Sequence, residues 1–163
     1  MKISVEGYKS IARKRTVNLT GLTILAGANS SGKSSFMQPL LLLKQTLESD
    51  FDAGSLMLDG ANVKLTDSSE IISKVPSIER EFFAIGFEDD VEETKAYYKF
   101  REKRGIHIDG IYHQSAEFPR GIRLHLGLKS SDIEPLLPEN EFGAFKKAFG
   151  GGARKVSWRV VRA

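Results

Sequence analysis

The chain has 163 residues, of which 40% are apolar and 28% are charged, values typical of a globular domain that buries its own core. It contains no cysteine, so disulfides, thiolate metal sites and cysteine nucleophiles are excluded. Its net charge of +3 is too small to indicate nucleic-acid binding by itself. The sequence has no apolar run near the roughly 18–20 residues that cross a membrane, and its first residues lack the apolar stretch of a signal peptide. We therefore expect a cytoplasmic protein with no membrane partner.

Strand patterns come first along the chain. Apolar and polar residues alternate over residues 2–7, and residues 16–19 give a second, weaker strand signal. Residues 22–26 form a compact apolar run (Leu-Thr-Ile-Leu-Ala), which predicts a strand buried on both faces.

A small polar loop over residues 27–32 then leads into a helix that we predict over residues 33–48. Apolar residues recur there at helical spacing: Phe36, Leu40, Leu43 and Leu47. Pro39 lies inside this helix and should bend or loosen its first two turns, because proline removes one backbone hydrogen bond.

From residue 55 to residue 129 the pattern indicates strands joined by turns. An Asp59-Gly60 turn is followed by alternating segments around residues 82–88, 94–101 and 122–128, and a shorter strand over residues 106–108 should end at a break at Gly110. Each segment has one apolar and one charged face, which favours antiparallel strands that are half exposed.

The remaining residues predict a helix over 132–148, a flexible break at Gly150-Gly151-Gly152 and a last strand over 156–161. We divide the chain into a P-loop core (1–50), an antiparallel β-subdomain (51–130), and a helix and strand (131–163) that lead to a missing carboxy-terminal lobe. The fold class we expect is α/β (α+β), with a mixed sheet plus the antiparallel β-subdomain.

One motif carries chemistry. Residues 27–34 match Gly-x-x-x-x-Gly-Lys-Ser/Thr, the phosphate-binding P-loop, directly after a predicted strand and directly before a predicted helix. Glycines let the backbone wrap so that its N–H groups converge on phosphate oxygens, and the helix N-terminus adds a positive dipole end. Lys33 supplies a full charge for the β- and γ-phosphates, and the Ser34 hydroxyl is a hard oxygen ligand for Mg²⁺. The nucleotide-binding residues that we predict for ATP and Mg are Gly27, Ala28, Asn29, Ser30, Ser31, Gly32, Lys33, Ser34 and Ser35.

The class of P-loop protein follows from the surroundings. Two strands precede the strand that leads into the P-loop, and the Asn-Lys-x-Asp element of GTPases does not occur. The segment after the helix has the pattern of antiparallel strands rather than of alternating strand and helix units. These features favour an ABC-type ATPase head over a small-molecule kinase.

The residues around the P-loop resemble those of a known family. Residues 1–11 (Met-Lys-Ile-Ser-Val-Glu-Gly-Tyr-Lys-Ser-Ile) and 22–35, with the leucine-rich helix and the segment over residues 58–71, look like the amino-terminal lobe of RecF/SMC-like AAA ATPases. The likeness is greatest to the branch that includes the overcoming-lysogenization-defect (OLD) nucleases, and it covers about residues 1–75.

This resemblance implies an ATP-binding head that works on DNA in repair or phage defence, as a homodimer or with a partner that supplies a signature lobe. It places Asn29 near the γ-phosphate and Ser35 near the α-phosphate. It also places Lys9, Ser10 and Arg13 where such proteins contact base, ribose or phosphate, although a solvated basic turn explains these three residues equally well.

The chain also departs from the family. The family's Walker B segment, an apolar run followed by Asp-Glu that completes the Mg²⁺ site, is imitated only by residues 82–90, which we interpret instead as a strand ending in an acidic turn. A signature loop is not visible, because Gly150-Gly151-Gly152 follows a phenylalanine rather than a serine. Asp67 or Ser68 occupies the place of the glutamine loop. We therefore expect little autonomous hydrolysis, with catalytic residues unknown.

Two other interpretations stay open. One is a complete kinase-like phosphotransferase that uses Glu88 or Asp89 as its catalytic acid, on a mostly parallel sheet. The other is a non-enzymatic DNA-binding or interaction module with a degenerate P-loop, for which a basic and aromatic stripe is the candidate surface: Tyr97, Lys99, Arg101, Lys103 and Arg104. A solvated strand face explains that stripe better, and the scattered histidines (His107, His113 and His125) are not expected to bind metal.

Overall fold

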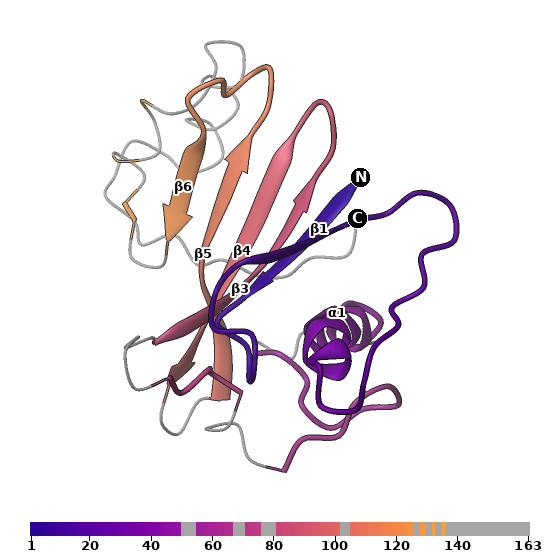
Figure 1. Ribbon diagram of the computed structural model, residues 1–163. Helices are drawn as coiled ribbons and strands as arrows, with labels where there is room; N and C mark the ends of the chain where they lie inside the picture. Colours follow the sequence, from indigo (N-terminus) through magenta and orange to yellow (C-terminus); the bar gives the residue numbers. More distant parts are fainter. Residues whose placement is uncertain are drawn as a thin grey trace.

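The described part of the chain contains one helix and one sheet (Figure 1). The computed structural model describes residues 1–49, 55–66, 71–75, 81–101, 105–125, 128–129, 132 and 135. The helix is α1 (Lys33–Leu47). The strands are β1 (Lys2–Glu6), β2 (Arg15–Asn18), β3 (Phe82–Glu88), β4 (Glu93–Arg101), β5 (Gly105–Gln114) and β6 (Ile122–His125).

The strands form one six-stranded sheet in the order β2-β1-β3-β4-β5-β6, and every neighbouring pair is antiparallel. The predicted antiparallel part is therefore confirmed, and it is larger than expected because β1 pairs directly with β3 (Ile3 opposite Phe87, Val5 opposite Ile85). The parallel strands of a mixed sheet do not occur among the described residues. The boundary that we placed at residue 50 stays a prediction, although the sheet joins strands from both sides of it.

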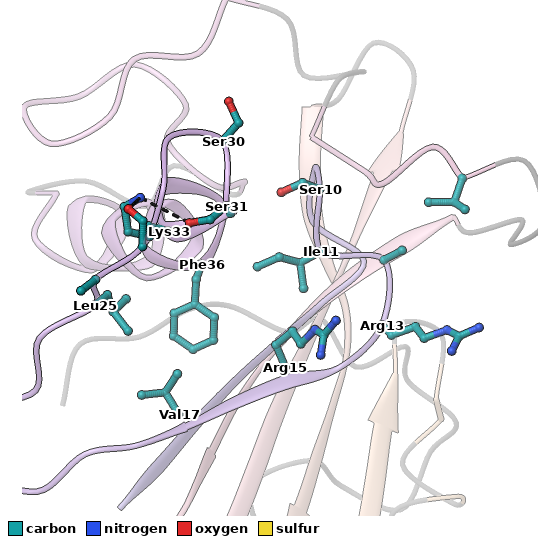
Figure 2. A pocket seen from close by; sticks show the side chains of 15 residues that line it. Ser10, Ile11, Arg13, Arg15, Val17, Leu25, Ser30, Ser31, Lys33 and Phe36 are labelled. Carbon is teal, nitrogen blue, oxygen red and sulfur yellow. Dashed lines mark hydrogen bonds between the residues drawn. The ribbon is translucent and has the colours of Figure 1, made fainter.

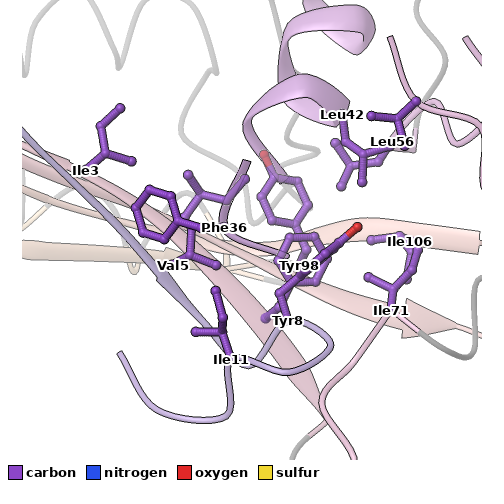
Figure 3. Packing of buried hydrophobic residues seen from close by; sticks show 13 residues of the cluster. Ile3, Val5, Tyr8, Ile11, Phe36, Leu42, Leu56, Ile71, Tyr98 and Ile106 are labelled. Carbon is purple, nitrogen blue, oxygen red and sulfur yellow. The ribbon is translucent and has the colours of Figure 1, made fainter. Parts of the chain in front are cut away.

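The two faces of the sheet differ in polarity, as the alternation predicts. The face toward α1 carries the core side chains of neighbouring strands, including Val5, Phe83 and Tyr98, which are at most 1% exposed. The other face carries polar residues such as Lys2, Glu88 and Lys95. Figure 3 shows the core, in which Phe36 and Leu42 of α1 meet the sheet residues. Burial of these apolar side chains holds the helix on the sheet.

Helix α1 runs from Lys33 to Leu47, close to the predicted range. Its buried residues recur every three positions and form one stripe: Phe36, Pro39, Leu42 and Gln45. Pro39 does not end the helix and contributes its ring to that stripe; the predicted bend stays a prediction.

A buried amide fixes the segment that follows the helix. The Gln45 Nε2 atom donates to the carbonyl oxygens of Met57 (2.6 Å) and Val63 (3.1 Å), and its Oε1 accepts from the backbone N–H groups of Asn62 (3.2 Å) and Val63 (2.9 Å). The predicted turn at Asp59-Gly60 is confirmed, since the Gly60 N–H donates to the Val63 carbonyl oxygen at 3.0 Å. Gln45 thus satisfies its polar atoms inside the core and holds this turn against α1.

The prediction of a buried strand over residues 22–26 is wrong. This segment is not assigned as a strand, and the side chains of Leu22 and Ile24 are 86% and 76% exposed. An apolar run indicates that its side chains favour burial, but it does not identify the element that would cover them. Among the described residues no strand pairs with this segment, and β2 forms the edge of the sheet.

The predicted break at Gly110 is also wrong. Strand β5 continues through this residue, which lies opposite Tyr97 of β4 and His125 of β6. A Cβ atom at Gly110 would lie 2.8 Å from the carbonyl oxygen of Leu124. The glycine therefore allows close approach of β6 rather than a turn.

The helix predicted over 132–148, the glycines at 150–152 and the strand predicted over 156–161 lie outside the described residues, apart from Asp132 and Pro135. In the part of the chain that the structure describes, no helix is both long and apolar enough to cross a membrane.

Candidate functional site

The P-loop lies at the start of α1, where the chain turns sharply (Figure 2). Gly32 has a φ of 91° and Ser30 a φ of 64°, both in the left-handed region that glycine adopts most easily. At Gly27, a Cβ atom would lie 3.0 Å from the Ser31 Oγ atom. The loop therefore needs glycine at its ends for two reasons, backbone conformation at Gly32 and close packing at Gly27.

The Lys33 side chain folds back over this loop. Its Nζ atom donates to the carbonyl oxygens of Gly27 (2.7 Å) and Ala28 (2.6 Å), and it lies 3.3 Å from the Ser31 Oγ atom. These three bonds use all three N–H donors of the ammonium and place its charge beside the loop, so an anion that binds there must replace at least one of them.

The N-terminus of α1 keeps its donors free of side-chain partners. Gly32 is the N-cap residue, no side chain caps the helix, and its first turn contains no acidic residue. The first intrahelical bond to close the turn runs from the Phe36 N–H to the Gly32 carbonyl oxygen (2.9 Å), so the N–H groups of residues 33–35 have no intrahelical partner. The positive end of the helix dipole is therefore not neutralised by the described chain, which suits phosphate binding.

A cavity of about 810 Å³ opens between the P-loop and the segment that joins β1 to β2. Its walls combine apolar side chains such as Ile11, Val17 and Phe36 with the cations Arg13, Arg15 and Lys33 (Figure 2). Apolar walls accept a flat aromatic base, and the cations accept phosphates. The predicted residues Ser10 and Arg13 line this cavity, whereas the Lys9 ammonium lies 5.8 Å from the ring centre of Tyr8.

A second cavity, of about 480 Å³, is also lined by Lys33. Lys33 and Ser34 line it together with Gln38, Asn62 and Lys64. The exposed Ser34 hydroxyl fits the hard oxygen ligand that Mg²⁺ takes from a P-loop, and carboxamides suit the water shell that Mg²⁺ keeps. The residues present thus fit the ion, although no carboxylate is among the described residues that line either cavity.

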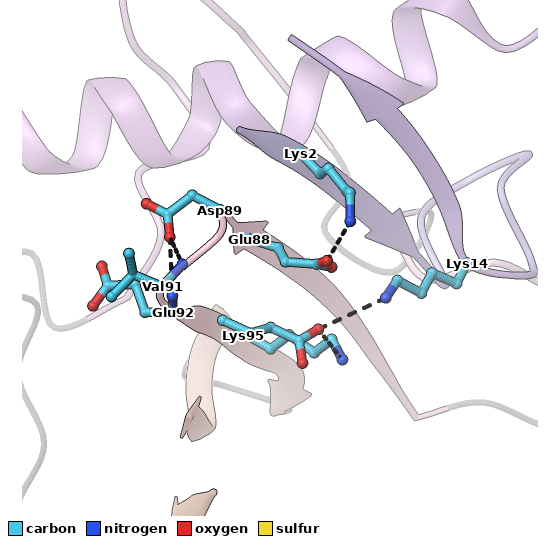
Figure 4. Close-up of polar contacts among 8 residues, drawn as sticks. Lys2, Lys14, Glu88, Asp89, Val91, Glu92 and Lys95 are labelled. Atoms are coloured by element: carbon cyan, nitrogen blue, oxygen red, sulfur yellow. Dashed lines mark hydrogen bonds and ion pairs between the residues drawn. The ribbon is translucent and has the colours of Figure 1, made fainter. Parts of the chain in front are cut away.

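Glu88 and Asp89 line neither of the two cavities at the P-loop. Figure 4 shows the contacts that they make instead. The Glu88 carboxylate bonds to the Lys2 ammonium (2.5 Å), which lowers the pKa of Glu88. The Asp89 Oδ1 atom accepts the N–H groups of Glu92 (2.9 Å) and Val91 (2.8 Å), and these bonds lower the pKa of Asp89. The acidic turn that we predicted is confirmed. The mostly parallel sheet that the kinase-like interpretation predicts is wrong for the described residues, where every strand pair is antiparallel. The acids that it uses also line neither cavity.

The other candidates do not converge on a site. Arg123 lies over the ring of Tyr97 (4.9 Å) and Lys99 pairs with Glu81, so the described part of the basic stripe is a polar strand face with internal partners. Within the described ranges, no group of three His, Asp or Glu residues could hold a metal. Asp67, Ser68, Lys103 and Arg104 lie outside the described residues.

Sequence reasoning missed part of the larger cavity. Arg15, Val17 and Val75 belong to its walls, and only the fold brings them to the P-loop. Phe36 could have been predicted from the sequence as a wall of this cavity. It is the first apolar residue of the helix after Lys33, and a buried residue at that position lies next to the loop.

A family model matches most of the chain. No curated protein matches this chain. A family model described as the AAA ATPase domain matches residues 1–125, a range that contains the P-loop, α1 and all six strands. The chain therefore belongs to the AAA ATPase domain family.

Proposed function

We propose that this chain binds Mg-ATP as the amino-terminal part of an ABC/RecF-like ATPase of the OLD-nuclease-like branch. The observation that carries the proposal is the Lys33 ammonium, held at 2.6–2.7 Å from two P-loop carbonyl oxygens beside a helix N-terminus without a side-chain cap. Membership of the AAA ATPase domain family supports nucleotide binding.

The two cavities suggest how ATP lies in the site. The β- and γ-phosphates take the loop N–H groups and the Lys33 ammonium, and the Ser35 backbone N–H points to the α-phosphate. The base and ribose then fill the larger cavity, against Phe36 and Val17. Ser34, which lines the other cavity, holds Mg²⁺, an ion that neutralises phosphate charge when it is bound.

Hydrolysis needs a group that orients or deprotonates water, and we propose that it comes from a further lobe or from a partner, as in a homodimer. Both cavities lack a carboxylate among the described residues. Beside the P-loop, the apolar side chains of Leu22, Ile24 and Met37 are exposed by 86%, 76% and 41%, which gives such a lobe an apolar surface to cover. A role on DNA, in repair or phage defence, follows from the likeness to the RecF-like branch alone.

Isothermal titration of the purified chain with ATP, with and without Mg²⁺, tests the proposal. We expect saturable binding of ATP to the wild type, with higher affinity when Mg²⁺ is present. For Lys33→Ala we expect a dissociation constant at least tenfold larger. Lys44→Ala is the matched control, because this exposed lysine lies in the same helix away from the loop. Equal affinity of the wild type and Lys33→Ala would contradict the site, and strong ATP turnover by the chain alone would contradict the need for a further lobe.

A further inference from the structure

The turn between β1 and β2 holds a serine rigidly beside the P-loop. The backbone N–H and carbonyl groups of Tyr8 and Ile11 bond to each other (3.1 and 2.8 Å), and Lys9 between them has a φ of 45°. The Lys9 N–H also donates to the carbonyl oxygen of Ile71 at 2.8 Å. Tyr8 is fully buried, with its ring centre 5.3 Å from that of Phe83. These contacts fix the position of Ser10 relative to the sheet.

The same turn contacts α1 at two points on one face of the helix. The Ser10 hydroxyl donates to the Ser35 Oγ atom at 2.9 Å, and the Tyr8 hydroxyl donates to the Gln38 Oε1 atom at 3.3 Å. Ser35 and Gln38 are three residues apart, so the two bonds follow neighbouring turns of the helix. Ser10 also lies against the P-loop itself, since a Cβ atom at Gly32 would lie 3.4 Å from its Oγ atom.

The direction of this bond depends on what binds beside it. Each hydroxyl can donate one proton, so when Ser35 donates its own to another acceptor, Ser10 is left to donate to Ser35 across the 2.9 Å contact. A hydroxyl that accepts a hydrogen bond becomes a stronger donor, because the bonds in a chain polarise one another. Ser35 is the last residue of the P-loop, and phosphate oxygens are strong acceptors of such a proton.

We propose that Ser10 is a positioning residue for the nucleotide: its hydroxyl fixes the Ser35 hydroxyl, which in turn donates to an oxygen of the α-phosphate. This inference rests on the proposed function. It assigns to Ser10 an action through Ser35 rather than a contact of its own with the base or ribose. Because ATP and ADP both carry the α-phosphate, the effect on the two affinities is equal.

Two variants that are isosteric with each other test the hydroxyl. Ser10→Thr keeps the hydroxyl and adds a methyl group, and Ser10→Val carries a second methyl group where threonine has the hydroxyl. Titration of the full chain with Mg-ATP and Mg-ADP should show Ser10→Thr within about twofold of the wild type, and Ser10→Val about fivefold weaker for both nucleotides. In a Ser35→Ala background the two variants should bind equally. Ser115→Ala, in the loop between β5 and β6, is the control that leaves affinity unchanged.

Two results overturn the inference. One is equal affinity of Ser10→Thr and Ser10→Val in the otherwise wild-type chain, a comparison that decides even where Ser35→Ala fails to fold. The other is a fivefold gap that persists in the Ser35→Ala background, because Ser10 then acts without Ser35. If the wild-type chain binds no ATP, the proposed function fails and the inference fails with it, whereas normal wild-type binding with either result above removes the inference alone.

Discussion

The polar groups at the two ends of helix α1 differ in their hydrogen-bond partners. At the carboxy-terminal end, Leu42 is fully buried and the amide of Gln45 makes four hydrogen bonds to the segment over residues 57–63. At the amino-terminal end no described side chain caps the helix, and the bonds of the Lys33 ammonium within the described residues go to its own loop. The buried end satisfies its groups within the chain and stabilises the fold. The exposed end presents donors to a ligand, so stability and binding depend on different residues of one helix.

Removal of a core side chain from the buried end should have the largest effect. We expect Leu42→Ala to lower the free energy of unfolding by about 2–5 kcal/mol, because it removes apolar contacts and leaves a cavity. Leu22→Ala is the matched control, since that side chain is 86% exposed, and it should change stability by less than about 0.5 kcal/mol. Urea unfolding of both variants measures the difference, and similar values would contradict the described packing.

The Gln45 amide is the next most important group at this end. Gln45→Leu keeps the size of the side chain but leaves the Met57 carbonyl oxygen and the N–H groups of Asn62 and Val63 without their partner. The Val63 carbonyl oxygen keeps only its bond from the Gly60 N–H. We therefore expect a loss of about 2–3 kcal/mol in urea unfolding. Gln38→Leu, which removes a single 3.3 Å bond from Tyr8, should cost less. A neutral Gln45→Leu variant would show that this amide does not hold the turn.

Gly60 faces the same amide. A Cβ atom at Gly60 would lie 2.7–2.9 Å from the Gln45 Cδ, Oε1 and Nε2 atoms, which cannot move without breaking their bonds. We expect Gly60→Ala to cost about 1–2 kcal/mol in the wild type and less in a Gln45→Ala background, where the space is free. Equal losses in the two backgrounds, measured by urea unfolding, would refute the coupling.

The acidic turn after β3 should have the smallest effect. Backbone N–H groups of Glu92 and Val91 lower the pKa of Asp89 in the folded chain below its unfolded value. Its stabilising contribution is therefore complete above the unfolded pKa, about 3.9, and is lost as pH falls through the lower folded pKa. Below about pH 4 the wild type should lose stability slightly more steeply than Asp89→Asn in thermal unfolding; parallel curves would contradict this assignment.

The structural features that the sequence predicts are those with a local residue pattern. The P-loop and α1 follow from residues 27–48, and the alternation of residues 82–88 predicts β3 because each strand shows its faces in its own sequence. The insertion of β1 between β2 and β3 was not predictable, since it depends on pairing between residues about 80 positions apart. The same holds for the exposure of Leu22 and for Gly110, where the neighbouring strand rather than the glycine decides the structure.

We propose that the amino-terminal end of α1 binds nucleotide independently of the buried end of the helix. The most direct test is the rise in thermal unfolding midpoint that saturating Mg-ATP produces in the wild type, Leu42→Ala and Lys33→Ala. At about one hundred times the dissociation constant, a ligand adds about 2.7 kcal/mol to stability. For a chain of this size that corresponds to a rise of about 5–10 °C. We predict similar rises for the wild type and Leu42→Ala, despite the lower starting midpoint of the latter. At the same ATP concentration we predict about half of that rise, or less, for Lys33→Ala, because tenfold weaker binding leaves about 1.4 kcal/mol of stabilisation. A full rise for Lys33→Ala, or none for the wild type, would contradict the claim.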